Sequence, residues 1–139
     1  MNVTESTLLK HTGNNERLKL FLKFTGVIEA ITGIGLVIIP SFLILVLLGT
    51  PSTDPVALIT GRLAGAALIT ISIACFISKD DSQSYLMIKA MLVYNILSTA
   101  LLVYASLVIG LSGPGLWPAV LVHTLLLAWS ILLLSLIHI

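Results

Sequence analysis

Long apolar runs, separated by short polar connections, fill most of this 139-residue chain. The runs lie at about 19–39, 55–77, 84–109 and 117–137. A helix of about 20 apolar residues is long enough to cross the hydrocarbon core of a bilayer. The pattern therefore predicts an all-α fold in which four transmembrane helices form one bundle.

The first apolar run is too long for one straight span. It covers residues 24–49 and is interrupted only by Glu29 and Pro40. Proline removes a backbone donor and clashes with the preceding turn. We therefore expect the first span to end near Ile39, and a short interfacial or re-entrant helix to follow at 41–48. The alternative is a single tilted and kinked helix, because proline is tolerated within transmembrane helices.

The N-terminal segment, residues 1–17, is polar and mixed in charge. Residues 12–15 (TGNN) should interrupt a helical pattern. We therefore interpret 1–17 as a flexible tail or short surface helix, and 18–139 as the transmembrane domain. A secretory signal peptide is not expected, because its apolar region would be only about 7–15 residues long.

Turn signals mark the later span boundaries. Pro55 suits a first helical position, where its missing N–H would be unpaired anyway, and Asp54 is the expected N-cap. Residues 80–82 are assigned to the connection before the third span, and residues 112–115 form the turn before the fourth. Because these connections are short, consecutive helices should pack antiparallel.

Composition and charge narrow the class further. Hydrophobic residues make up 58% of the chain and charged residues only 9%, whereas soluble domains carry about 25% charged residues. The lipid bilayer is therefore the expected surrounding. The net charge of +1 gives no reason to expect a nucleic-acid partner. The single cysteine, Cys75, excludes an intrachain disulfide and a CxxC motif.

Basic residues indicate the orientation. The positive-inside rule assigns basic flanks to the cytoplasm, and an even number of spans returns the chain to the side where it began. We therefore predict a multi-pass protein of the cell inner membrane with both termini cytoplasmic. The basic residues that support this are Lys10, Arg17, Lys19, Lys23, Lys79 and Lys89.

Each predicted span carries at least one candidate for a buried polar residue, and these candidates are Glu29, Arg62, Asn95 and His123. Polar and ionisable side chains are costly inside a membrane, and they usually face the bundle interior or a cavity. Helix geometry places all four in the middle or outer half of the bundle. They are the predicted polar cluster and the candidate ligand-binding residues.

Each of these residues also has a simpler interpretation. Glu29 and Arg62 could form a structural ion pair, bind a ligand, proton or ion, or lie at the membrane surface. Asn95 could be a hydrogen-bonding contact between helices. His123 is more typical of a packing histidine than of a metal ligand, because one imidazole with one carboxylate is an incomplete zinc shell. No metal site is predicted.

Glycines predict where helices approach closely. Gly61 and Gly65 form a GxxxG motif around Arg62, and Gly26 and Gly33 share a helix face with Glu29. Small residues allow close packing in lipid. We expect packing within the chain, with a dimer contact as the alternative.

Catalytic motifs are absent from the sequence. It contains no Walker A loop, Rossmann fingerprint, HExxH or GxSxG motif. No pair of histidines is placed to hold a haem. We assign no catalytic residue, and an enzyme would have to rely on Glu29, Arg62 and His123.

Several segments resemble small bacterial four-helix membrane proteins of the DoxX-like kind. They are Ile39-Pro40, Leu47-Leu48-Gly49, the segment 61–66 (GRLAGA), and the fourth span with His123. The resemblance covers roughly residues 20–137. Some proteins of that kind are linked to respiratory quinone reduction or to thiol redox partners, and most have no established activity. This chain lacks paired cysteines, which puts a thiol role in doubt. The resemblance implies a site or packing role only for Arg62 and its flanking glycines.

These observations favour a non-catalytic membrane subunit or a binder of a small amphiphilic ligand, a quinone or a lipid. No cofactor is required by this interpretation. The alternative is an oligomeric transporter or channel that uses Glu29 and His123 as proton-sensitive groups. An enzyme is the third hypothesis. Beyond the bilayer, the expected partners are a second copy of the chain or a larger membrane complex.

Overall fold

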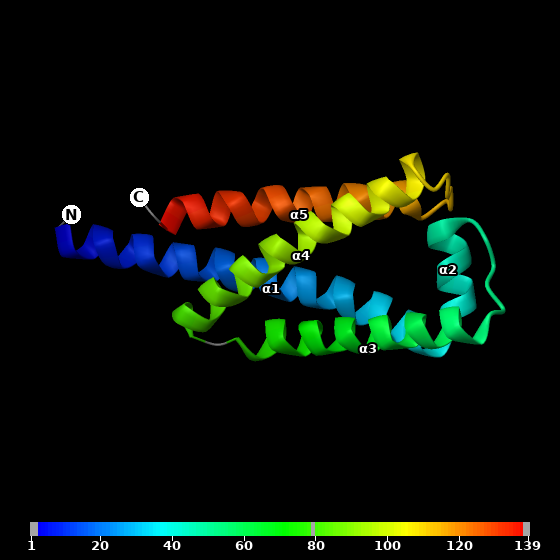
Figure 1. Cartoon of the computed structure of the whole chain (residues 1–139). Coiled ribbons are helices and arrows are strands. Elements are labelled where there is room, and N and C mark those ends of the chain that lie inside the picture. The colour runs from blue at the N-terminus through cyan, green and yellow to red at the C-terminus, as the bar shows by residue number, and fades with distance from the viewer. Residues whose placement is uncertain (1–2, 79, 138–139) are drawn as a thin grey trace.

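The fold is a bundle of helices. The computed structural model describes residues 3–78 and 80–137, and the side chains of 15–78, 80 and 82–136. These residues contain no strand. The helices, shown in Figure 1, are α1 (Val3–Ile38), α2 (Pro40–Leu48), α3 (Pro55–Ile77), α4 (Asp81–Leu107) and α5 (Leu116–Ile137).

Four of these helices, α1, α3, α4 and α5, are long and apolar enough to cross a membrane. The prediction of an all-α bundle with four spans is confirmed, and the chain is a multi-pass membrane protein. α3 has the predicted bounds, and the Asp54 carboxylate accepts a hydrogen bond from the Ala57 N–H at 2.9 Å. α4 begins earlier than predicted, at Asp81; Asp80 stands at the N-cap position in an extended conformation, without a capping hydrogen bond from its side chain.

α1 is a single helix of 36 residues. The predicted interruption at residues 12–15 is wrong. One glycine costs a helix only about 1 kcal/mol, and the long apolar part of α1 supplies the nucleus from which the helix extends. The apolar span within α1 covers Asn15–Ile38. The division into a polar tail and a transmembrane domain stays a prediction.

α2 confirms the break predicted at Pro40. Pro40 is the first residue of α2, and Ile39 before it leaves the helical conformation with φ −128° and ψ 57°. α2 runs across the end of the bundle, roughly perpendicular to α3 (Figure 1). The alternative of one continuous kinked span is therefore wrong. Gly49 ends α2 in the left-handed conformation, with φ 79°.

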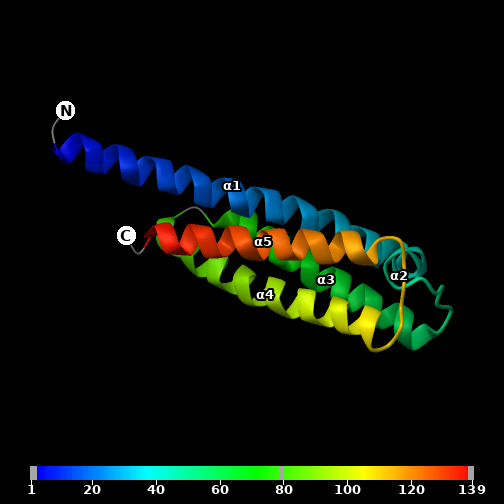
Figure 2. The ribbon, with the colours of Figure 1, turned by 90° about the horizontal axis from the view of Figure 1, so that it is seen from above.

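The four spans form two closely packed pairs, α1 with α3 and α4 with α5. Figure 2 shows α1 and α5 running alongside each other, with α4 on the other side of α5 from α1. Although α3 and α4 are consecutive, they hardly contact each other. Contacts of α1 with α4 and α5 join the two pairs. The short connection between α3 and α4 did not produce the packed antiparallel pair that we predicted.

Backbone contact holds α1 against α3. A Cβ atom added to Gly65 would lie 2.6 Å from the Gly33 carbonyl oxygen, and one added to Gly33 would lie 2.8 Å from the Gly65 oxygen. The buried Ser72 hydroxyl donates to the Gly26 carbonyl at 2.8 Å. Gly61 is less crowded, since a Cβ there would lie 3.5 Å from its nearest neighbour, in Pro40. The close approach thus depends on Gly33 and Gly65.

The apolar core lies toward the end of the bundle where α3 ends and α4 begins. The edge of the Phe21 ring meets the Trp129 ring there, with centroids 5.4 Å apart. This core closes one end of the bundle and leaves the middle to polar side chains. Its buried members are Leu18, Phe21, Leu22, Cys75, Ile88, Met91, Leu126 and Leu133.

Candidate functional site

Three helices bring polar side chains together in the middle of the bundle. Glu29 comes from α1, Tyr94 and Asn95 from α4, and His123 from α5. We call these four residues the polar cluster. The structure thus unites three of the four residues that the sequence singled out and adds a tyrosine.

Glu29 is the carboxylic acid that α1 contributes to one end of this cluster. Its side chain is only 2% exposed, and its Oε2 accepts a hydrogen bond from the Tyr94 hydroxyl at 3.1 Å. Its other oxygen, Oε1, is buried and has no hydrogen-bond partner. Buried polar atoms in native proteins are nearly always paired. One face of the Glu29 carboxyl group is therefore available to a further hydrogen-bonding group.

Asn95 fixes the orientation of His123. The Asn95 Nδ2 donates to the Met91 carbonyl at 2.7 Å, so its Oδ1 is the atom that faces His123. The distance from this Oδ1 to the His123 Nδ1 is 2.8 Å. Because a carbonyl oxygen only accepts, Nδ1 must carry the hydrogen. In neutral His123 the other ring nitrogen, Nε2, is then an acceptor.

Tyr94 connects the carboxyl group to the imidazole. Its hydroxyl donates to Glu29, while its ring meets the His123 ring edge-on, with centroids 5.6 Å apart and an interplanar angle of 76°. The cluster is therefore continuous from α1 through α4 to α5. Its groups can donate and accept hydrogen bonds, and they lie among apolar helices.

A second unpaired group lies one helical turn from Glu29. The Thr25 hydroxyl is buried and has no hydrogen-bond partner, and residues four apart share a face of a helix. Thr25 and Glu29 together present an unpaired hydroxyl and an unpaired carboxyl oxygen on one face of α1. On α4, one turn beyond Asn95, the buried Thr99 hydroxyl is also unpaired.

Arg62 lies outside the polar cluster. Its side chain is exposed, and its Nε donates to the Val37 carbonyl at 3.2 Å. Val37 is roughly 12 Å along the helix from Glu29, at about 1.5 Å per residue. The closest approach at Gly33 and Gly65 sets this register between α1 and α3. The ion pair considered for Glu29 and Arg62 is therefore wrong, whereas a ligand-binding role for Arg62 stays a prediction.

The sequence did carry a signal for Tyr94, which our interpretation missed. Tyrosine in membrane proteins is enriched at the two interfaces. Tyr94 instead stands in the middle of a span, directly before Asn95. A mid-span tyrosine needs a partner for its hydroxyl, and Glu29 provides it.

Among the residues that the structure describes, no three His, Cys, Asp or Glu side chains form a group that could hold a metal ion. Cys75 is a free thiol, and it is buried between α1 and α3 in the apolar core rather than in the polar cluster. The chemistry available at the cluster is hydrogen bonding and proton exchange.

Double-mutant cycles should separate the two candidate partners of Glu29. We expect Glu29→Gln and Tyr94→Phe to be coupled by about 0.6–1.7 kcal/mol, the range for hydrogen bonds between membrane helices. Glu29→Gln and Arg62→Gln should be additive within about 0.5 kcal/mol, because the two side chains share no contact. Unfolding of the purified variants in detergent measures both. Strong coupling to Arg62 would contradict the register described here.

The fold and the cluster define a small all-helical multi-pass membrane protein with a polar interior site. Comparison of this chain with protein-family models, curated proteins and solved structures finds no match. The DoxX-like resemblance is therefore not tested and stays a prediction.

Proposed function

We propose that this protein is a non-catalytic membrane subunit or binding protein that holds the polar group of a small amphiphilic ligand at the polar cluster. The observation that carries the proposal is the Glu29 carboxyl group, which is buried with one oxygen unpaired. Leaving a buried acceptor unsatisfied costs about 1–3 kcal/mol. A ligand that hydrogen-bonds there would recover this energy.

The neighbouring groups define what the ligand offers. The Thr25 hydroxyl is an unpaired donor, the Glu29 Oε1 accepts when the carboxyl group is ionised and can donate when it is protonated, and the His123 Nε2 can accept. A quinone presents carbonyl oxygens to such donors, and its reduced form presents hydroxyls to such acceptors. A lipid headgroup with hydroxyl or carbonyl groups has the same chemistry. In either case an apolar tail would remain in the lipid beside the bundle.

An oligomeric transporter or channel is the weaker proposal. It would place Glu29 on an axis shared between copies of the chain. The Glu29 side chain instead faces α4 of its own bundle, where it bonds to Tyr94. Four spans also provide few helices for a transport path in a single copy. We retain two further parts of the proposal: the protein lies in the inner membrane, and both termini are cytoplasmic. The basic residues Lys19 and Lys23 in the N-terminal part of the span in α1 support this orientation.

A short-chain ubiquinone titrated into the detergent-solubilised protein tests this proposal. We expect the melting temperature to rise with quinone concentration in the wild type, as for any ligand that binds only the folded state. Glu29→Gln and Tyr94→Phe should each reduce the shift. Arg62→Gln is the matched control, because Arg62 lies outside the cluster and should leave the shift unchanged.

The possible outcomes separate the ligand classes. A shift that is equal in all four proteins would mean that quinone binds elsewhere or only to the detergent micelle. If quinone produces no shift but lipids co-purify with the wild type and not with Glu29→Gln, the ligand is a lipid. If neither ligand binds, the cluster serves only to join the helices, and the proposal fails.

A further inference from the structure

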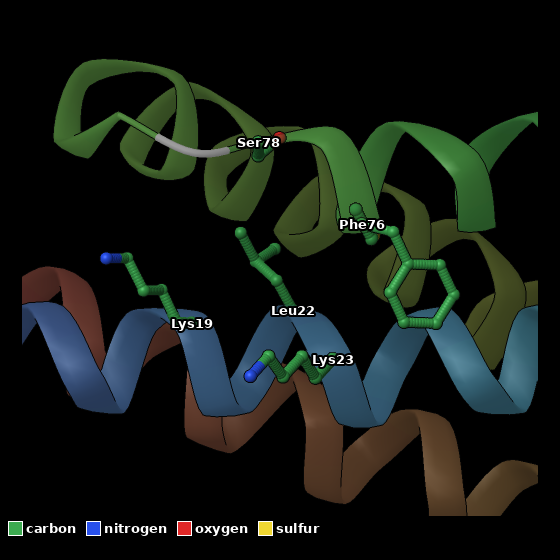
Figure 3. Close-up of a pocket in the computed structure, with 6 residues that line it drawn as sticks. Lys19, Leu22, Lys23, Phe76 and Ser78 are labelled. Atoms are coloured by element: carbon green, nitrogen blue, oxygen red, sulfur yellow. The ribbon is translucent and has the colours of Figure 1, made fainter.

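A cavity separate from the polar cluster lies at the end of the bundle where α3 ends. It has a volume of about 240 Å³ and is lined by Lys19, Leu22, Lys23, Cys75, Phe76 and Ser78. Figure 3 shows that Lys19, Leu22 and Lys23 come from α1, whereas Phe76 and Ser78 lie at the end of α3. The cavity is thus formed between the two helices of the closest pair.

The helix packing explains why this cavity exists. At Gly26 the missing side chain lets the Phe76 ring lie against α1, at 3.2 Å from where a Cβ would stand. α3 ends at Ile77, while α1 continues for several more turns toward its N-terminus. The turn of α1 that carries Lys19 and Lys23 therefore extends past the end of its partner helix. The Phe76 ring lines the cavity that remains beside this turn of α1.

The cavity is positively charged. Among the described residues, Lys19 and Lys23 are the charged ones that line it, and they stand one helical turn apart. Neither forms an ion pair with another residue in the described parts of the chain. The nearest acidic residues along the sequence, Glu16 and Asp80, are exposed and do not line the cavity. Two ammonium groups on successive turns of one helix concentrate positive charge at the cavity, so an anion between the two turns would be attracted by both.

The other wall of the cavity is apolar. Leu22, Cys75 and Phe76 line it, and the Leu22 side chain points across toward Ser78 in Figure 3. The Ser78 hydroxyl donates to the Ala74 carbonyl at 2.7 Å, which leaves its oxygen lone pairs as acceptors. No basic residue follows Lys23 in α1, so the two lysines stand in the part of the span where basic residues meet the membrane surface. A ligand with an anionic head and a hydrocarbon tail matches both walls.

We propose that this cavity binds one anionic phospholipid, with its phosphate between Lys19 and Lys23 and an acyl chain along Phe76. Lysine is well suited to a phosphate as a compact point charge. Anionic lipids attract basic residues at the membrane surface, and the cavity would convert that general attraction into a defined site. The proposal does not depend on ligand binding at the polar cluster, which lies deeper in the bundle.

Native mass spectrometry of the full chain in detergent tests the proposal. The protein is titrated with dioleoylphosphatidylglycerol and, in parallel, with zwitterionic dioleoylphosphatidylcholine. We expect the first phosphatidylglycerol to bind about thirtyfold more tightly than phosphatidylcholine, given the combined contribution of two basic residues near a lipid phosphate. In Lys19→Gln/Lys23→Gln this preference should disappear.

Two further variants distinguish a defined site from diffuse charge. Lys89→Gln removes a positive charge from the first turns of α4, where Lys89 Nζ lies 4.3 Å from the centre of the Tyr85 ring and lines no part of the cavity. This variant should keep the preference. Ser78→Trp fills the cavity without changing the charge and should weaken phosphatidylglycerol binding.

Three results would overturn the proposal. One is an equal loss of preference in Lys89→Gln and in Lys19→Gln/Lys23→Gln, which would indicate surface charge alone. Another is unchanged phosphatidylglycerol binding in Ser78→Trp, which would place the lipid outside the cavity. The third is effective competition by millimolar glycerol phosphate, which would show that the site takes a free phosphate without an acyl chain.

Discussion

Replacing Gly65 with alanine should lower the free energy of unfolding by about 1–3 kcal/mol, the usual cost of overpacking a tight interface. The added Cβ would lie 2.6 Å from the Gly33 carbonyl oxygen and 2.9 Å from the Leu36 Cβ. Neither neighbour is the flexible end of a side chain, so α1 and α3 must move apart. Thermal or chemical unfolding in detergent measures the change.

Gly61→Ala is the matched control for this prediction. It introduces the same methyl group into the same GxxxG motif, but at a position where the nearest atom is 3.5 Å away. Alanine is intrinsically the better helix former by up to about 1 kcal/mol. We therefore expect Gly61→Ala to be neutral or slightly stabilising. Equal destabilisation by both substitutions would mean that the motif forms a contact other than the one with Gly33.

Replacing Asn95 with leucine should be the most damaging single change within the polar cluster. The substitution removes the acceptor of the His123 Nδ1–H and the donor to Met91. A buried partner left without a hydrogen bond costs about 1–3 kcal/mol. His123→Leu should carry a similar cost, because it leaves the Asn95 Oδ1 unpaired. The double variant should cost less than the sum, since both polar partners are then gone.

A cycle with Ser130 provides the comparison. Ser130 shares a face of α5 with His123, but its hydroxyl donates to the Leu126 carbonyl within its own helix at 2.8 Å. Asn95→Leu and Ser130→Ala should therefore be additive within about 0.5 kcal/mol. If Asn95 and His123 also prove additive, the hydrogen bond between them does not contribute to stability.

Much of the fold follows from the sequence because the bilayer restricts the length and the composition of a helix that crosses it. The predicted bounds of α3 are correct because Asp54, Pro55 and the following apolar run all point to the same start. Pro40 likewise marks the start of α2. The extent of α1 was harder to predict, because residues 12–15 have only weak local preferences. A long helix that is already formed can override such preferences.

Helix pairing was the part that local patterns could not supply. The short connection between α3 and α4 favours an antiparallel pair of these two helices. In the structure α3 packs against α1 instead. The reason is visible in particular residues. Gly33 and Gly65 allow backbone contact between α1 and α3, whereas the sequence of α4 contains no glycine. A sequence shows that glycines can pack closely, but not which helix they will meet.

The same limit explains the outcome at the candidate site. Asn95 and His123 could be selected because a polar residue within a span needs a partner. The assignment of Arg62 as a partner of Glu29 depended on the register between α1 and α3. The structure places Arg62 beside Val37 instead. The position of polar residues within the spans thus predicted the candidates for the site, while the register between helices determined which of them contact each other.

The position of α2 determines how the bundle can open. α2 belongs to the α1–α3 half, yet its Val46 carbonyl accepts a hydrogen bond at 2.8 Å from the Gly115 N–H, directly before α5. The two halves are thereby tied at that end. In the middle of the membrane, the Glu29–Tyr94 hydrogen bond joins them. Opening the bundle would therefore have to break this tie, the Glu29–Tyr94 hydrogen bond and the apolar core at the opposite end, where the Phe21 ring of α1 meets the Trp129 ring of α5. The polar cluster is thus held between two joined ends of the bundle.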